Sequence, residues 1–570
     1  MRVAVFVLVS LALESFVLAP PLRAQGSTPS NILLILADDL GVDRVGAYAE
    51  HPDPGRTPHI DALAARGVLF RNAWADPVCS SSRAAMLTGR YGFRTGVGRG
   101  IGQYNDRELS IDTPTLADAL RPAYATAFVG KWHLHSTPGS NYLVHPFELG
   151  FDFYGGGMDV FPLFIGDGYS LFVKNSQGNL GISTTYATTD EADDALFLTR
   201  WLPEPWFVVL SFHAPHAPFH KPPAHLHTQT LPASVAGNIP VHAKAAVEAM
   251  DTEIGRLFAG MDPDVLADTV VLFMGDNGTD GPATTWPFDP WRAKKTIYEG
   301  GINVPLIVAG PGVAVGAESA ALVDSSDLFA TIADIAGAPH DTATDSVSFL
   351  PHLLDPSRPS TRPWVYAEFF DANGWGPYLR NDRTVRDTRH KLLRFHLPWS
   401  HAYREEFYDL VADPWEHTNL LLGVLTPEQQ SALDGLRQAL SELYVPWVES
   451  HPGLAGSFGA PRLTGEGPLA AGTPVQIELS GARPNSWGLL FVGLQLLNAP
   501  LFGGTLVPDA WTAGTQFVLP TTAAGGFVLS STWPAGLEPG TSLWLQHWHW
   551  DPGAVQGAAA SNALRAMTPP

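Results

Sequence analysis

Five short apolar runs, separated by amphipathic stretches, constrain the fold of this chain more than any other feature of the sequence. The runs are NILLILA from residue 31, TAFVG from 126, WFVVLSF from 206, TVVLFMG from 269 and VPLIVAG from 304. Each is continuous rather than alternating, which is typical of strands buried on both faces of a parallel sheet. Helical patterns lie between them, at HIDALAARGVLF from 59 and AKAAVEAMDTEIGRLFAGM from 243. The alternation predicts an α/β domain with a mostly parallel sheet flanked by helices.

The composition changes along the chain and divides it into segments. Residues 1–24 contain the apolar stretch VAVFVLVSLAL and are expected to be a signal peptide. The α/β domain is expected over 25–360, and the shorter strands and final helix of 361–450 predict a small α+β subdomain. A stretch rich in Gly and Pro predicts a linker over 451–468. Residues 469–570 contain no lysine and five short strand-like runs, which predict an all-β sandwich module.

The charge balance bounds the partners of this protein. The formal net charge is −22, with no block of Lys and Arg, which argues against nucleic acid or an anionic membrane surface as a partner. No later stretch approaches the roughly 20 apolar residues that a transmembrane helix requires. We therefore expect no transmembrane span, and export to the periplasm or the extracellular space.

Polar side chains follow four of the five apolar runs, directly where each predicted strand ends. In chain order the pairs are Asp38 with Asp39, Lys131 with His133, His213 with His216, and Asp276 with Asn277. Because the carboxyl ends of parallel strands meet at one edge of a sheet, we expect these groups to share a crevice. The first and last pairs supply hard oxygen ligands, which suit Ca²⁺ or Mg²⁺ and not zinc or copper. Taken singly, either pair also fits a helix cap or a turn.

The only cysteine of the chain, Cys79, lies in the stretch PVCSSSRAAMLTGRY. A lone cysteine in an exported protein is either a buried apolar filler or a reactive group. The sequence places Cys79 at or near a helix N-terminus with Arg83 one turn later, and both features stabilise negative charge. Sulfur is a poor ligand for a hard cation, so we expect an oxygen function to replace the thiol here.

The stretch CSSSR followed by AAMLTGRY resembles the signature of the formylglycine-dependent (type I) sulfatases of the alkaline phosphatase superfamily. In that family the cysteine is oxidised to an aldehyde during export. Five further segments are similar to family segments in the expected order, namely GKWHL from 130, APHAP from 214, GDNG from 275, KKTIYEGGINVP from 294 and YDLVADPWEHTNL from 408. The resemblance implies an alkaline phosphatase-like fold and a sulfuric ester hydrolase. Ser81 stands where the family usually has proline, and Asn303 where arginine is common.

The resemblance also implies roles for individual residues. It implies that Ca²⁺ is bound by Asp38, Asp39, Asp276 and Asn277, with the modified Cys79 completing the shell. The residues implied to surround the sulfate are Arg83, Lys131, His133, His216 and Lys294. Lys294 is preferred to Lys295 because it precedes Tyr298 by four residues, the family spacing. His213 has no assigned role in this pattern.

The implied reaction starts with attack on sulfur by the aldehyde hydrate at Cys79, with Asp276 as base. His216 and Lys294 serve the departing alcohol, and His133 then removes a proton from the second hydroxyl so that sulfate leaves. Arg83 and Lys131 offset charge on the sulfate oxygens. The resemblance implies a formylglycine-generating enzyme as a partner during maturation.

The sequence leaves two other functions open. One is a phosphate or phosphonate ester hydrolase of the same superfamily, and the other is a catalytically silent sulfated-glycan-binding protein. The substrate of a sulfatase here is either a sulfated small molecule, such as an aryl sulfate, or a sulfated glycan.

The strand-like run SLWLQHWHW near the C-terminus also allows two interpretations. Strand alternation places Trp544, Gln546, Trp548 and Trp550 on one face, with Leu545, His547 and His549 on the other. An exposed tryptophan face would stack on sugar rings. A buried one would fill the core of the sandwich.

Overall fold

The computed structural model describes residues 30–102, 106–136, 141–159, 168–340, 344–374, 378–397, 402–443, 446–511, 514–537 and 541–568. The expected signal peptide lies outside the described residues. No helix within these ranges is both long and apolar enough to cross a membrane.

The centre of the fold is a sheet of ten strands, in the order β10-β2-β9-β8-β1-β7-β3-β4-β5-β6. Their bounds are β1 (Asn31–Ala37), β2 (Val68–Trp74), β3 (Ala125–Gly130), β4 (Phe153–Gly156), β5 (Phe172–Ser176), β6 (Asn179–Ser183), β7 (Trp206–Ser211), β8 (Thr269–Gly275), β9 (Leu306–Ala309) and β10 (Ala317–Asp324). The neighbours β8, β1, β7, β3 and β4 run parallel, which confirms the α/β prediction. The fifth predicted strand, β9, is antiparallel to β8 and β2.

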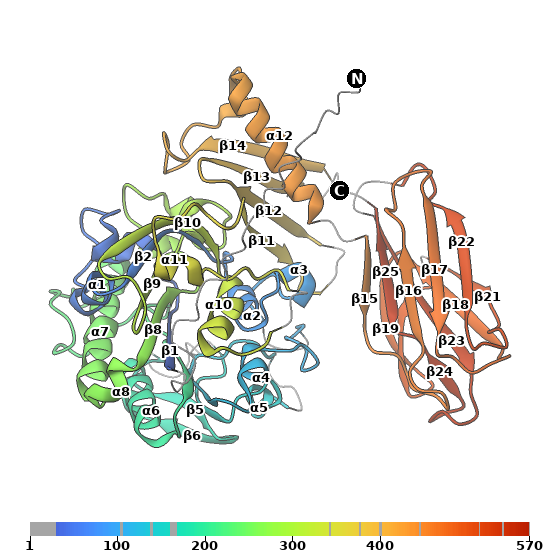
Figure 1. Ribbon diagram of the computed structural model, residues 1–570, viewed down its shortest axis with the longest axis horizontal. Helices are drawn as coiled ribbons and strands as arrows, with labels where there is room; N and C mark the ends of the chain where they lie inside the picture. Colours follow the sequence, from blue (N-terminus) through green and yellow to red (C-terminus); the bar gives the residue numbers. More distant parts are fainter. Residues whose placement is uncertain are drawn as a thin grey trace, which may run out of the picture.

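Helices cover both faces of this sheet, as Figure 1 shows. On one face Leu34 of β1 packs with side chains of α2 (Cys79–Thr88), α4 (Leu116–Leu120) and α10 (Asp327–Ala336). On the other, Leu33 packs with α1 (Pro58–Ala65), α6 (Ala187–Trp201) and α7 (Ile239–Gly260). Because both faces are covered, every residue of β1 is buried, which explains the continuous apolar run.

The shorter helices lie in the connections. They are α3 (Gly92–Thr95), α5 (His145–Glu148), α8 (Pro263–Ala267), α9 (Glu299–Ile302) and α11 (Leu350–Leu354), with 3₁₀ turns η1 (Val42–Arg44), η2 (Gly46–Tyr48), η3 (Gly281–Ala283), η4 (Pro290–Arg292) and η5 (Leu420–Leu422). The predicted helix from residue 59 is shorter than expected, because α1 ends at Ala65 and Val68 begins β2. Gly67 separates the two elements, where a Cβ would lie 2.1 Å from the Val308 carbonyl oxygen.

A second, antiparallel sheet follows the α/β domain. It consists of β11 (Val365–Asp371), β12 (Arg380–Arg386), β13 (His390–Leu397) and β14 (Ala402–Asp409), in that order. Helix α12 (Pro427–Glu442) starts at a capping box between Thr426 and Gln429. Its buried face, including Leu436, packs on Leu392 and Phe407 of the sheet. This is the expected α+β subdomain fold.

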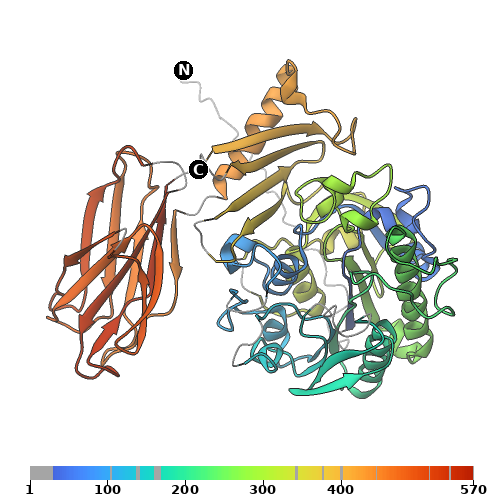
Figure 2. The same cartoon turned by 180° about the vertical axis from the view of Figure 1, so that it is seen from behind.

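The C-terminal region is all-β and lies to one side of the rest of the chain in Figures 1 and 2. Its strands are β15 (Trp447–Ser450), β16 (Arg462–Glu466), β17 (Pro474–Ser480), β18 (Gly488–Gly493), β19 (Leu496–Leu501), β20 (Gly504–Pro508), β21 (Gly514–Val518), β22 (Phe527–Thr532), β23 (Ser542–Trp550), β24 (Ala558–Ala560) and β25 (Ala563–Met567). One sheet has the order β15-β25-β23-β18-β21, with β24 on β23, and the others are β16-β17-β22 and β19-β20.

The stretch predicted as a linker over 451–468 is partly structured. Strand β16 pairs antiparallel with β17, and Leu463 within it is fully buried. Strand β15, expected in the α+β subdomain, pairs instead with β25. Trp447 of β15 packs against Gly465, where a Cβ would lie 2.1 Å from the indole. The β module therefore begins directly after α12, because strand pairing and this contact recruit both short segments.

Strand β23 resolves the two interpretations of its tryptophans. Trp544 and Trp548 are buried, and they pack with side chains of the β19-β20 hairpin such as Val507. Leu545, on the opposite face, packs in the core between the two larger sheets. Only Trp550, at the end of the strand, is exposed. Trp544 and Trp548 are therefore core residues of the β module.

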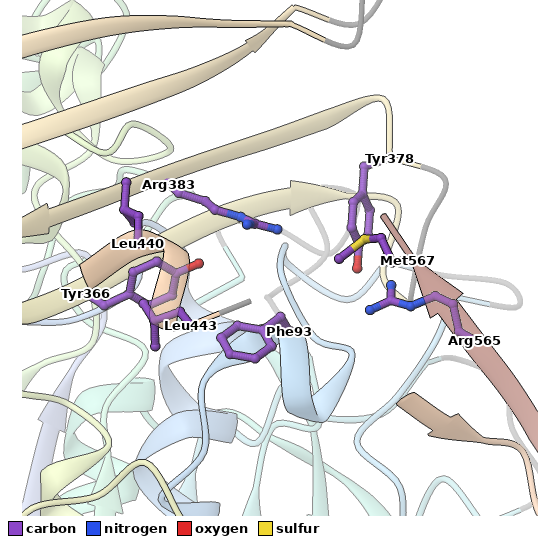
Figure 3. A pocket seen from close by; sticks show the side chains of 8 residues that line it. All are labelled: Phe93, Tyr366, Tyr378, Arg383, Leu440, Leu443, Arg565 and Met567. Carbon is purple, nitrogen blue, oxygen red and sulfur yellow. The ribbon is translucent and has the colours of Figure 1, made fainter. Parts of the chain in front are cut away.

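Figure 3 shows a junction at which the β module meets the other two parts of the chain. Arg565, from β25, is hydrogen-bonded to Tyr378 in the loop before β12. A pocket at this junction is lined by Phe93, Tyr366, Tyr378, Arg383, Leu440, Leu443, Arg565 and Met567. These residues come from α3, β11, β12, α12 and β25 and their adjoining loops, so the junction joins all three parts of the chain.

Candidate active site

The polar groups predicted at the strand ends lie together at the carboxyl edge of the central sheet. Strand β1 is flanked by β8 and β7, and β3 adjoins β7, all parallel. The contacts cross these strands, since the Lys131 ammonium binds the Asp38 carboxylate and the Asp39 amide donates to Asp276 Oδ1 at 3.1 Å. These contacts bring the strand ends after β1, β3 and β8 together, and of the pair after β7 only His216 joins them.

Three buried carboxylates face three buried cations at this edge. Lys131 pairs with Asp38, and Lys294 pairs with Asp39. Arg83 reaches Asp276 Oδ2 through Nε at 3.0 Å and Nη2 at 2.8 Å. Each of the six side chains is at most 5% exposed.

The three carboxylates repel one another in spite of these partners. Burial, reinforced by the charge of Asp38, raises the pKa of Asp276 well above its ordinary value. Burial also raises the pKa of Asp39. Burial opposes ionisation of Asp38 as well, but Lys131 and the other nearby cations hold its pKa well below the ordinary range. Such a cluster favours a bound cation between the carboxylates.

The donor atoms fit a hard divalent cation. Asp38 Oδ1 and Asn277 Oδ1 are buried and make no hydrogen bond within the described part of the chain. The Asn277 amide donates to Asp39 Oδ1 at 2.8 Å and to the Gly278 carbonyl at 2.9 Å, so its own oxygen is left for another partner. Ligand atoms of Asp38, Cys79 and Asp276 lie within 4.8 Å of one another. Carboxylate and amide oxygens suit Ca²⁺ or Mg²⁺, whereas the Cys79 sulfur does not.

Cys79 is the first residue of α2 and is buried. Its Sγ lies 3.1 Å from Nδ1 of His133. His133 Nε2 lies 3.1 Å from the Ile101 carbonyl, which only accepts, so Nε2 carries the proton and Nδ1 is the acceptor toward Cys79. Burial and the neighbouring Lys131 lower the pKa of His133 to about 3, so the ring is neutral.

The serines after Cys79 position the start of α2. Ser80 Oγ donates to the His133 carbonyl at 2.8 Å and accepts from the Ile101 amide at 3.0 Å. Ser81 Oγ donates to the Val78 carbonyl at 3.0 Å. Ser82 Oγ lies 3.1 Å from that same carbonyl. Ser80 therefore fixes His133 beside Cys79, while the other two serines turn back onto the helix N-terminus.

The two histidines after β7 have different positions. His216 Nε2 lies 3.8 Å from Asp39 Oδ2, and burial together with Lys294 holds the pKa of His216 well below its ordinary value. His213 points elsewhere, with Nδ1 at 2.5 Å from Oε1 of Glu191 in α6. His216 thus belongs to the cluster, and His213 supports the strand end from behind it.

Three supporting residues were not predicted from the sequence. Ser211 Oγ donates to the Lys131 carbonyl at 2.8 Å and accepts from Arg83 Nη1 at 2.5 Å. The Tyr169 hydroxyl contacts the carbonyls of His213 and His216, both at 2.8 Å. Glu191 holds His213. Ser211 is the one polar residue within its apolar run, a signal that was available, whereas Tyr169 and Glu191 lie in segments without a pattern.

Two family models match the chain. One described as Sulfatase matches residues 30–338, and one described as N-sulphoglucosamine sulphohydrolase, C-terminal, matches residues 289–445. The β module, from β15 onward, lies outside both matches.

Curated proteins and solved structures agree with these matches. N-acetylgalactosamine-6-sulfatase of Sus scrofa is 33% identical over 377 residues, which cover 59% of this chain and 68% of that protein. Arylsulfatase A of Homo sapiens is 29% identical over 486 residues, which cover 75% of this chain and 91% of that protein. The structure of Ps i-CgsB in complex with k-i-k-neocarrahexaose has a TM-score of 0.60 at 23% identity, over 73% of this chain and 92% of that chain. The PsFucS1 sulfatase from Pseudoalteromonas sp. has a TM-score of 0.56 at 22% identity, over 73% and 90%. Both structures show the same fold.

Proposed function

The chain belongs to the sulfatase family and is a sulfuric ester hydrolase, and we propose that it acts through a formylglycine derived from Cys79 and a bound Ca²⁺. One observation carries this proposal. The only cysteine lies at the start of a buried helix, 3.1 Å from a neutral histidine and in one cluster with two carboxylates. A thiol fits such a hard-ligand cluster poorly, whereas an oxygen function derived from it fits well.

Asp38, Asp39, Asp276 and Asn277 would hold the Ca²⁺, together with the modified Cys79 side chain. The two buried oxygens without a partner, on Asp38 and Asn277, support this assignment. When bound, the ion supplies positive charge that stabilises oxygen anions in the site. Arg83, Lys131 and Lys294 keep the remaining carboxylate charge balanced, so the cluster tolerates burial.

The residues around Cys79 are placed for proton transfer and charge stabilisation. A hydrated formylglycine supplies a hydroxyl nucleophile at this position, together with a second hydroxyl. His133 is held with its bare Nδ1 toward the side chain of residue 79, so it is the base at that atom. Arg83 and Lys131, fully buried beside it, stabilise negative charge on the sulfate oxygens.

His216 and Lys294 lie at the Asp39 side of the cluster. Both face the carboxylate of Asp39, whereas Lys131 binds Asp38. We assign them to the alcohol that leaves, which one of them protonates or stabilises.

We propose a sulfated glycan as the substrate, export of the chain, and a formylglycine-generating enzyme as its maturation partner. The relatives support the first point, since one is named N-acetylgalactosamine-6-sulfatase and one solved neighbour is in complex with k-i-k-neocarrahexaose. The apolar stretch near the N-terminus supports export to the periplasm or the extracellular space.

The test is hydrolysis of 4-nitrophenyl sulfate by protein produced together with a formylglycine-generating enzyme. Removing the nucleophile in Cys79→Ala or the base in His133→Ala is expected to lower kcat by about 10²–10⁴-fold. The control His59→Ala removes an exposed histidine of α1 and leaves kcat unchanged. Full activity of Cys79→Ala, or faster cleavage of 4-nitrophenyl phosphate than of the sulfate, contradicts the proposal.

A further inference from the structure

This chain contains few lysines, and they differ in whether they pair with a carboxylate. There are seven lysines among 570 residues of net charge −22. Five of them form ion pairs with carboxylates, namely Lys131, Lys174, Lys244, Lys294 and Lys391. Within the described residues, Lys221 and Lys295 have no carboxylate within 4.0 Å. Lys295 is exposed and its backbone directly follows Lys294 of the catalytic cluster, and its charge opposes the burial that raises the pKa of Asp280.

The backbone of Lys295 is held in a conformation that lysine rarely adopts. Its φ is +69°, in the left-handed region, which costs a residue with a Cβ about 1–2 kcal/mol. Its amide donates to the Pro77 carbonyl at 2.9 Å, two residues before Cys79. As a result two consecutive lysines diverge, with Lys294 buried on Asp39 and Lys295 in solvent. A strained residue beside a catalytic cluster motivates a functional hypothesis.

Arg380, the first residue of β12, lies against the same backbone. Its Nη2 donates to the Lys295 carbonyl at 2.9 Å, and its Nε contacts Asp382 Oδ2 at 2.5 Å. The guanidinium lies over the Phe369 ring, 4.1 Å from the centroid. Its Nη1 makes no hydrogen bond to any described residue, and the side chain is 36% exposed. The contacts therefore hold the guanidinium rigid while two of its donors stay available.

We propose that Lys295 and Arg380 form an anion subsite, which binds a second sulfate or carboxylate group on the substrate. The inference rests on the proposed function, because the scissile sulfate would lie in the cluster around Cys79. Arg380 pairs with Asp382, whereas Lys295 has no carboxylate within 4.0 Å and only acts at longer range on Asp280, in a chain whose overall charge repels polyanions. Charge complementarity therefore favours a substrate with an anionic group beside the scissile ester, such as a multiply sulfated or uronate-containing glycan.

The test compares kcat/KM for substrates that differ in the second anion. N-acetylgalactosamine 6-sulfate carries one anion, the 4,6-disulfate adds a sulfate, and a disaccharide with a uronic acid adds a carboxylate. Lys295→Asn removes the charge and keeps a residue that tolerates positive φ. Arg380→Gln removes the second cation, Lys295→Arg keeps the charge, and Arg462→Gln is a control on the exposed surface of the β module.

The wild type is expected to prefer the two dianionic substrates. Lys295→Asn and Arg380→Gln should each reduce that preference by about tenfold, as loss of one charge-assisted contact predicts. Lys295→Arg and Arg462→Gln should retain it, and hydrolysis of 4-nitrophenyl sulfate should stay within about twofold in all four. Equal losses on every substrate, or a loss in the control as large as in Lys295→Asn, would overturn the subsite. The sulfate and carboxylate arms show which anion it takes.

Binding measured with Cys79→Ala separates the two proposals. Lys295→Asn in this background should weaken binding of the disulfate by about tenfold and leave the 6-sulfate unchanged. An inactive wild type that still shows this selective binding contradicts the proposed function alone. If the wild type is active but Lys295→Asn changes neither its selectivity nor its binding of the disulfate, the subsite alone is contradicted.

Discussion

Replacing Lys391 with methionine tests the buried ion network behind the catalytic segment that begins at Lys294. The Lys391 side chain is fully buried on β13, with Nζ 2.9 Å from Glu299 Oε1 and 2.9 Å from Glu416 Oε1. It also lies 4.8 Å from the centroid of the Trp74 ring, at the end of the strand that leads to Cys79. Methionine keeps the length of the side chain and removes its charge, so two carboxylates lose a buried partner.

The size of the effect follows from those contacts. Removing one partner of a buried ion pair costs about 3–5 kcal/mol. The remaining contacts limit this loss of free energy. Glu299 keeps Arg386 Nη1 at 3.3 Å, and Glu416 Oε2 keeps the Glu299 amide at 2.6 Å. With an unfolding entropy of about 2.1 cal/mol/K per residue over roughly 400 residues, the loss lowers Tm by about 4–6 °C.

The effect should depend on pH. Burial, with Lys391 opposing it, raises the pKa of Glu416 to about 7, above its value in the unfolded chain. Its proton therefore stabilises the folded state at low pH, and that contribution disappears as pH rises through about 7. Above that pH the ionised Glu416 needs Lys391 most. The deficit of Lys391→Met should be largest at about pH 8 and smaller at about pH 5.5.

Scanning calorimetry at the two pH values measures this. The matched control is Lys244→Met, whose ion pair with the exposed Asp53 lies at the surface and contributes about 0–1 kcal/mol, so its Tm should change by about 1 °C at most. Equal losses in the two variants would refute the reasoning. So would a Lys391→Met deficit that grows as the pH falls.

Three further predictions concern the metal, the maturation and the domains. Adding Ca²⁺ at about 100 times its Kd to chelator-treated protein should raise the free energy of unfolding by about 2.7 kcal/mol, which raises Tm by about 3 °C. Asp38→Asn should abolish that shift. A larger shift with Zn²⁺ contradicts the calcium site. Ser81→Pro restores the proline that is usual in the family and should raise the modified fraction of Cys79 in a heterologous host. The helix should tolerate this proline, because the amide of the third residue of α2 has no intrahelical acceptor. An unchanged fraction in peptide mass spectra refutes this prediction. A chain ending after residue 443 lacks the β module but keeps every proposed catalytic residue, so it should hydrolyse 4-nitrophenyl sulfate. A truncated chain that is folded by circular dichroism but inactive contradicts this prediction.

Much of the central domain follows from the sequence, because burial on both faces demands continuous apolar strands. The same logic located the site, since Asp38, Lys131, His216 and Asp276 each follow a strand end and parallel strands bring those ends together. The antiparallel direction of β9 was not predictable, because a buried apolar run reads the same in either direction.

Other features depend on contacts between distant segments. Strands β15 and β16 are short and half-exposed, and only their partners β25 and β17 reveal them as strands. Tyr169 and Glu191 act on the strand end after β7 from segments that carry no motif. The left-handed conformation of Lys295 likewise results from the Pro77 and Arg380 contacts, which no local pattern encodes.

The central claim is that the sulfur of Cys79 is exchanged for an oxygen function before the enzyme works. Peptide mass spectrometry of the chain from its native source, over residues 72–90, tests it most directly. The account predicts a peptide in which residue 79 has the mass of formylglycine or its hydrate and resists alkylation by thiol reagents. A native, sulfatase-active preparation in which this peptide carries only intact or alkylated cysteine would contradict it.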